Sequence, residues 1–157
     1  MINTRTMMAK LGGIKSPAEL DTLWSRRMSD QLRYGHSYWA VELRETGAIL
    51  GSCGIRIADN YRHTPVAGMA ELGWRIAEQH WNRGYAREAA EAAIGWGWAH
   101  LAAREMGAWT TIGNERSWRL MERLGMVRRT DLDFRHRAFA EDDPLGAMIV
   151  YTLARPE

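Results

Sequence analysis

Hydrophobic and polar residues alternate across residues 71–77, and this segment predicts a strand. Leu72, Trp74 and Ile76 are apolar, and polar residues or glycine stand between them, which is the period of two expected of a pleated strand. After a short turn-like stretch, residues 86–101 repeat small apolar residues at spacings of three and four, which predicts a helix with a narrow apolar face. A strand, a loop and a helix therefore form the centre of the chain.

An earlier helix is predicted to begin at Ser16. The segment Ser16–Glu19 has the form of a capping box with a proline at the first helical position, and Gly35 is a plausible end. The apolar stripe expected on this helix consists of Leu20, Leu23, Trp24 and Met28.

The remaining elements complete a layered α/β pattern. Asn114 is expected to cap a further helix that ends at Gly125, with Met126 folding back onto Met121. The expected strands are residues 38–43 and 48–57, which form a hairpin, then 108–112, 128–134 and 147–153. This order indicates a mixed, mostly antiparallel sheet flanked by helices.

Composition narrows the class of protein. The 157 residues suffice for one domain, 1–157, with its own core. The 21 Lys and Arg residues nearly balance the 19 Asp and Glu residues, unlike the strong basic bias of nucleic-acid-binding proteins. The single cysteine, Cys53, suits a reducing compartment, and no long apolar run predicts a membrane span. We therefore expect a cytoplasmic protein without nucleic-acid or membrane partners. The five histidines lack metal-ligand spacing, so we expect no metal site.

The loop before the long helix has the features of an anion site. Gly84 permits a sharp turn or a close approach to the backbone, and free N–H groups that lead into a helix N-terminus attract anions. The alternative is an ordinary tight connection between a strand and a helix, and the loop alone does not decide between the two.

Two segments resemble motifs of the GNAT superfamily of acyl-CoA N-acyltransferases. Residues 81–86, Trp-Asn-Arg-Gly-Tyr-Ala, are similar to its acyl-CoA loop, Gln/Arg-x-x-Gly-x-Gly/Ala, with the first-position Trp common in the branch that acetylates ribosomal-protein N-termini. Residues 114–117, Asn-Glu-Arg-Ser, followed by 124–126, Leu-Gly-Met, are similar to its Asn-x-x-Ser helix. The resemblance covers about residues 38–153 and implies the GNAT fold. Family members usually open with a further strand and helix, which this chain lacks before residue 16.

The resemblance also implies acetyl-CoA as co-substrate. Its pyrophosphate would lie on the loop, and its peptide-like pantetheine arm would pair with the strand edge near Ile76 and Ala77. The predicted cofactor-binding residues are Ile76, Ala77, Trp81, Asn82, Arg83, Gly84, Tyr85, Ala86 and Asn114.

Glu71 is the candidate general base, because an attacking amine must lose its proton. It lies beside Gly73, which leaves space, and the alternative is a structural pair with Arg75. Many family members use a Tyr as general acid where this chain has Met121. Ser117 remains as a weaker candidate proton donor, or as a surface residue of its helix.

These features predict an N-acetyltransferase that moves the acetyl group of acetyl-CoA to a primary amine by direct attack in a ternary complex. The acceptor would be a protein N-terminus, a lysine or a small amine. The alternatives are a degenerate domain that binds CoA without turnover and a cofactor-free interaction module. The missing first strand leaves a sheet edge exposed, so we also expect a homodimer.

Overall fold

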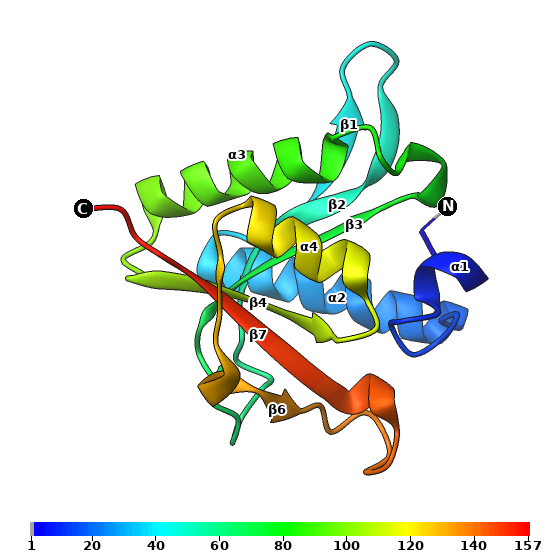
Figure 1. Cartoon of the computed structure of the whole chain (residues 1–157). Coiled ribbons are helices and arrows are strands. Elements are labelled where there is room, and N and C mark those ends of the chain that lie inside the picture. The colour runs from blue at the N-terminus through cyan, green and yellow to red at the C-terminus, as the bar shows by residue number, and fades with distance from the viewer. Residues whose placement is uncertain (1) are drawn as a thin grey trace.

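A seven-stranded sheet forms the middle layer of the computed structural model, which describes residues 2–157 (Figure 1). The strands are β1 (Tyr38–Leu43), β2 (Ala48–Ile57), β3 (Ala70–Ile76), β4 (Glu105–Thr111), β5 (Val127–Arg128), β6 (Phe134–Arg135) and β7 (Ala147–Ala154). Their order is β1-β2-β3-β4-β7-β5, and β6 also pairs with β7. Among these pairings, only β3 with β4 is parallel. The predicted mixed, mostly antiparallel sheet is confirmed.

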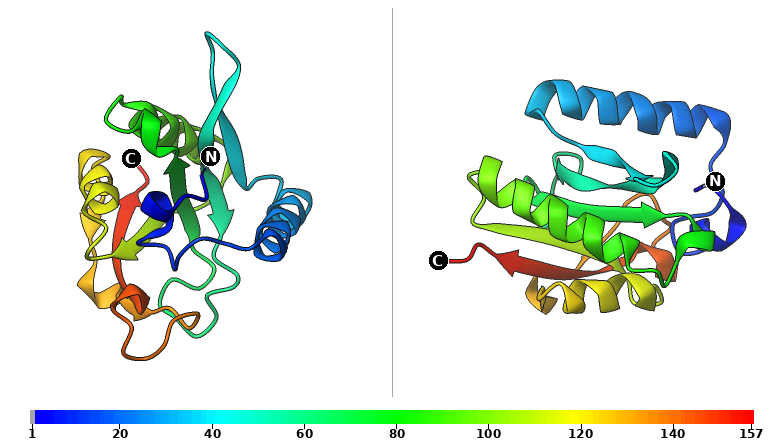
Figure 2. Two further views of the ribbon diagram at one scale, coloured as in Figure 1. Left: turned by 90° about the vertical axis from the view of Figure 1, so that its right-hand side faces the viewer. Right: turned by 90° about the horizontal axis from the view of Figure 1, so that it is seen from above.

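Helices cover both faces of the sheet. They are α1 (Arg5–Met8), α2 (Pro17–Tyr34), α3 (Tyr85–His100) and α4 (Glu115–Arg123), with 3-10 turns at Glu78–His80, Thr130–Leu132 and Pro144–Gly146. Figure 2 shows α2 on one face and α3 with α4 on the other. The predicted capping box starts α2, and Gly35 ends it in the left-handed conformation.

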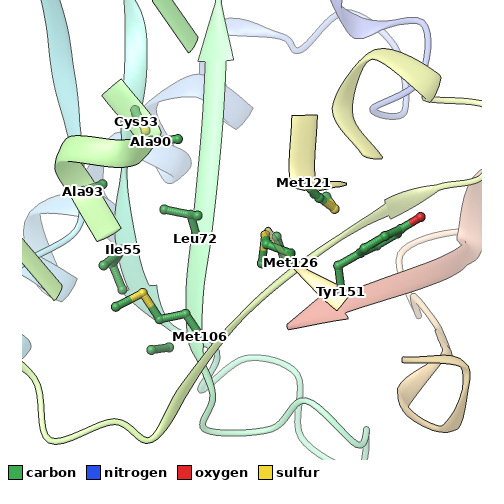
Figure 3. Close-up of a cluster of buried hydrophobic side chains, with 11 residues drawn as sticks. Cys53, Ile55, Leu72, Ala90, Ala93, Met106, Met121, Met126 and Tyr151 are labelled. Carbon is green, nitrogen blue, oxygen red and sulfur yellow. The ribbon is translucent and has the colours of Figure 1, made fainter. Parts of the chain in front are cut away.

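The main apolar core lies between the sheet and the face of α3 that carries small residues (Figure 3). Ala90 and Ala93 are buried there, and a Cβ atom added to Gly97 would overlap the side chains of Met106 and Ile55. The small residues predicted on this helix therefore allow its backbone to lie close to the strands.

The two central strands diverge soon after they meet. β3 and β4 pair at Ala70 with Met106 and at Glu71 with Gly107, and no further pair joins these two strands. β3 continues to Ile76 beside β2. Its second half therefore has an open edge on the side of β4, and this opening positions the candidate site.

The predicted strand 128–134 is wrong in its middle. The Asp133 carboxylate accepts hydrogen bonds from both terminal nitrogens of Arg128 and from the backbone N–H of Val150. A side chain thus takes the place of a backbone partner on β7, and a 3-10 turn separates β5 from β6. The strand propensity of residues 128–134 does not reveal that a side chain replaces the backbone partner here.

The α2 helix is confirmed, but most of its predicted apolar stripe faces outward. Trp24 is 56% exposed and Met28 is 61% exposed. The helix instead turns Asp30, which is 6% exposed, toward the sheet, because Asp30 lies 3.9 Å from Arg56 on β2. Polar contacts rather than apolar packing therefore orient α2.

Residues 2–16 contain no strand, as the sequence predicts. This segment is held by its own contacts: the Asn3 amide donates to the Lys15 carbonyl and accepts from the Lys15 N–H, both at 2.8 Å. β1 is therefore an edge strand of the sheet within the described chain. None of the helices in residues 2–157 combines the length and the apolar character needed to cross a membrane.

Candidate active site

A cavity of about 750 Å³ occupies the opening between β3 and β4. Its walls come from the N-terminal segment, α2, β3, the loop at 81–86, α4 and the loop around His136. It is of the size of ordinary small-molecule sites. One continuous space therefore joins the predicted cofactor loop to the predicted base.

The cofactor loop has the backbone geometry of an anion site. Gly84 is the N-cap of α3 with φ +85°, and Asn82 also has a positive φ of 60°. The first helical hydrogen bond runs from the Glu88 N–H to the Gly84 carbonyl, so the three preceding N–H groups have no helical acceptor. A Cβ atom added to Gly84 would meet nothing within 4 Å, which leaves the space above the loop open.

Trp81 ties this loop to its neighbours. Its indole N–H donates to the Ile76 carbonyl at 2.7 Å, and the Arg116 guanidinium lies 4.2 Å from the centre of its ring. Arg116 also donates to the Asn82 side chain at 2.8 Å, whereas Arg83 is exposed. Contacts with α4 therefore hold the loop in place.

The strand edge differs from the prediction at Ala77. The Ala77 N–H donates to the Leu50 carbonyl, and the Ala77 carbonyl accepts from the His80 N–H. Alternation along the strand then points the backbone groups of Trp74 and Ile76 away from β2 and toward the opening, where the Ile76 carbonyl already accepts from the Trp81 indole. Both backbone groups of Ala77 are therefore already paired within the chain, and the part of the edge that stays open consists of Trp74 and the N–H of Ile76.

Asn114 and Ser117 line the cavity from the start of α4. The expected side-chain cap is absent, and the Asn114 amide nitrogen donates to Thr110 Oγ1 at 2.9 Å. The Ser117 N–H donates to the Asn114 carbonyl, and its half-buried side chain borders the cavity. Met121, 2% exposed, lies further along the same helix. The predicted contact at the end of α4 is confirmed by the bond from the Met126 N–H to the Met121 carbonyl.

Glu71 pairs with Arg56 rather than with Arg75. Its Oε2 atom lies 3.5 Å from Arg56 Nε, with both side chains largely buried. This oxygen accepts no hydrogen bond from the residues that the structure describes. Burial raises the pKa of Glu71 to about 6, although Arg56 and Tyr38 oppose the rise. At neutral pH the side chain is therefore mainly a carboxylate that can accept a proton.

Tyr38 fills the space that the sequence leaves open beside Gly73. A Cβ atom added to Gly73 would lie 2.6 Å from the Tyr38 hydroxyl oxygen. Burial, and then the charge of Glu71, raise the pKa of Tyr38 well above its usual value, so the phenol keeps its proton. A hydroxyl donor therefore lies in the cavity near the carboxylate, which the sequence does not predict.

A family comparison agrees with this geometry. The model for the acetyltransferase (GNAT) domain matches residues 1–127. The chain belongs to the GNAT acetyltransferase family. The YkkB protein of Bacillus subtilis is similar to this GNAT domain, with 31% identity over 126 residues that cover 80% of this chain and 71% of that protein.

Solved structures share the fold of this GNAT domain. An acetyltransferase from Agrobacterium tumefaciens has 25% identity and a TM-score of 0.73, over 94% of this chain and 78% of that one. Spermidine N-acetyltransferase from Vibrio cholerae, solved with CoA and spermine, has 18% identity and a TM-score of 0.69, over 97% of this chain and 84% of that one. At 18% identity, the similarity to the spermidine N-acetyltransferase shows only that the two chains share a fold.

Two walls of the cavity of this GNAT domain have no counterpart among the residues predicted from the sequence. They are the N-terminal segment, with Met7, Lys10 and Leu11, and the inner face of α2, with Arg26 and Arg27. No motif marks either segment. The only available signal was the set of charged residues that α2 carries between its apolar positions. The loops at 59–68 and 135–144 also border the cavity, through Tyr61 and Phe139 among others.

Proposed function

We propose that this GNAT domain is an N-acetyltransferase that moves the acetyl group of acetyl-CoA to a primary amine by direct attack in a ternary complex. The observation that supports this most strongly is the one continuous cavity that joins the open N-terminus of α3 to Glu71. A cofactor and an acceptor can therefore meet within one site.

The residues present fit acetyl-CoA. The free N–H groups at the start of α3 suit the pyrophosphate, and the open edge of β3, at Trp74 and the Ile76 N–H, suits the amide groups of the pantetheine arm. A backbone N–H on the same edge would stabilise the oxyanion that forms on the thioester carbonyl. Asn114 and Ser117 would border the arm from α4.

In the proposed reaction, the nitrogen lone pair of the amine attacks the thioester carbonyl carbon, and the C–S bond breaks. Glu71 accepts the proton that the amine loses, directly or through water, while Tyr38 orients the carboxylate or the amine. The leaving thiolate has a free pKa of about 8.5, so it needs little help from an acid. Ser117 would donate a hydrogen bond to the sulfur rather than a full proton.

A two-step experiment tests the proposal. Calorimetric titration with acetyl-CoA measures cofactor binding, and a panel of amines is then screened for release of free thiol. We expect binding in the micromolar range or tighter and turnover with at least one amine class. Absence of binding would overturn the proposal in favour of a cofactor-free module.

A second function, CoA binding without turnover, is supported by Met121 at the position of the family's usual acid. Binding in the first step with no thiol release for any amine would favour this alternative. We also propose that the protein is cytoplasmic. Its amine acceptor would be a protein N-terminus, a lysine or a small molecule.

We also propose that the protein is a homodimer. The edge strand β1 and the outward apolar side chains of α2, Trp24 at 56% and Met28 at 61% exposure, support a contact between copies. Light scattering across a concentration series is expected to show twice the monomer mass. A monomer at every concentration would contradict this.

A further inference from the structure

Two arginines on the acceptor side of the cavity have no carboxylate partner. Arg75 on β3 makes no ion pair within 4 Å and no side-chain hydrogen bond with any residue of the described chain, although it is half-buried. Within the described residues, the Arg27 side chain on α2 makes a single long hydrogen bond, from Nη2 to Ser52 Oγ at 3.4 Å, and no ion pair. Partly buried cations without a counter-ion are costly and uncommon.

These two side chains converge on one place. Ser52 on β2 is the register partner of Arg75 on β3, so their side chains stand next to each other on the same face of the sheet. Arg27 reaches the same Ser52 from above, and all three residues line the cavity. Burial, and then the charge of Arg27, lower the pKa of Arg75. The site therefore holds two positive charges close together.

The neighbouring carboxylates are already paired with other cations. Asp59 accepts from Arg26 at 2.8 Å, and Glu71 lies 3.5 Å from Arg56. Asp30 lies 3.9 Å from both of those arginines. Within the described residues, no acidic side chain lies within 4 Å of Arg27 or Arg75. A bound ligand remains as the source of the missing negative charge.

We propose that Arg27 and Arg75 bind a carboxylate of the acceptor, so that the acceptor is an amino acid or another amine that carries a carboxylate. This inference rests on the proposed acetyltransferase function. Paired guanidinium groups match the planar, bidentate geometry of a carboxylate.

The positions agree with such an acceptor. Arg75 and Glu71 lie on the same face of β3, four residues and therefore about 13 Å apart at their Cα atoms. The Tyr38 phenol lies between them over Gly73, and Arg27 lies 5.5 Å from the centre of its ring. The Glu71 and arginine side chains extend from these positions, so the gap between their charged groups is not the Cα separation. An acceptor that spans this gap would place its amine at Glu71 and its carboxylate at the arginines.

The test compares acids with amides of the same amines. Glycine, β-alanine and 4-aminobutyrate, which differ in the spacing of the two groups, are assayed beside their primary amides and beside a diamine. We expect a higher kcat/KM for at least one acid than for its amide. Equal rates for every acid and amide pair, or a preference for the diamine, would overturn the proposal.

Variants locate the effect. Arg75→Gln is expected to lower kcat/KM for the preferred acid about 10- to 100-fold, through KM, and to leave the amide unchanged. Arg119→Gln removes an exposed arginine that pairs with Glu115 outside the cavity, and it is expected to change neither substrate. If Arg75→Gln instead weakens acetyl-CoA binding, the arginines belong to the cofactor site and the proposal fails.

A binding experiment separates this proposal from the proposed function. The N-acetylated form of each acid is titrated into the parent protein and into Arg75→Gln, with detection by NMR and without any cofactor. Binding to the parent and at least tenfold weaker binding to the variant would support the carboxylate site even if no turnover occurs. Equal affinity for both proteins would refute the site even if the protein acetylates amines.

Discussion

Gly84→Val is expected to abolish acetyl-CoA binding while the protein stays folded. Gly84 has φ +85°, and a Cβ atom there would meet nothing within 4 Å, so the new side chain would enter open space rather than the core. The cost to folding is the left-handed backbone conformation, about 1–2 kcal/mol for a residue with a Cβ. In a chain of this size that cost lowers Tm by roughly 2–8 °C.

The cost to binding is larger because the same open space would hold the pyrophosphate. Each charge-assisted hydrogen bond from the loop is worth about 1.5–3 kcal/mol, so loss of one contact weakens binding roughly 10- to 150-fold. If the valine also shifts the backbone away from the phosphates, several contacts are lost together. The expected result in calorimetry is no detectable binding at cofactor concentrations that saturate the parent.

Gly35→Val is the matched control. Gly35 ends α2 with φ +78°, and its Cβ would also meet nothing within 4 Å, but it does not line the cavity. We expect a similar decrease in Tm and an unchanged affinity for acetyl-CoA. If Gly84→Val binds acetyl-CoA like the parent, the loop is an ordinary connection and our reasoning is refuted. If both variants lose binding equally, the loss reflects stability alone.

Three further variants test other parts of the structure. Glu71→Gln is expected to lower kcat about 10²–10⁴-fold with little change in acetyl-CoA affinity. The rate of the parent protein should fall as pH drops below about 6, because protonation of Glu71 at that pKa removes the base. Rate profiles of both proteins from pH 5 to 9 check these expectations, and an unchanged rate of the variant at neutral pH excludes Glu71 as the base. Tyr38→Phe removes only the hydroxyl, so we expect a decrease in kcat with an unaltered melting temperature, whereas a change in stability alone would assign Tyr38 to structure. Gly97→Val places atoms against Met106 and Ile55 and is expected to destabilise the fold by about 1–3 kcal/mol. Denaturant unfolding measures this change, and stability equal to that of the parent would mean that α3 can shift away from the sheet without cost.

The main elements were predictable because their signals are local. The capping box at Ser16, the Ala-rich face of α3 and the alternation in residues 71–77 each depend on a few neighbouring residues. The strand at 128–134 was not predictable in full, because Asp133 bonds to β7 across a long separation in sequence. The outward turn of Trp24 follows from the polar contacts of Asp30, which the apolar pattern does not contain.

The site divides in the same way. The backbone conformation at Gly84 and the strand that ends at Ile76 could be predicted because each depends on a short local stretch of sequence, while their roles in cofactor binding stay predictions. The partner of Glu71 could not, since the sequence pointed to Arg75 on the same strand and the structure supplies Arg56 from β2. Tyr38 belongs to β1, and only the sheet register brings its phenol over Gly73.

The early divergence of β3 and β4 divides the sheet into two antiparallel blocks. In residues 2–157, two register pairs join the block of β1, β2 and β3 to the block of β4, β5, β6 and β7. With so few shared hydrogen bonds, the blocks can exchange amide protons in separate opening events. A ligand that pairs along the open edge and contacts both blocks would stabilise both of them against opening, because neither could open without loss of ligand contacts. Native-state hydrogen exchange should then show two opening free energies without cofactor and one common, higher value at saturation.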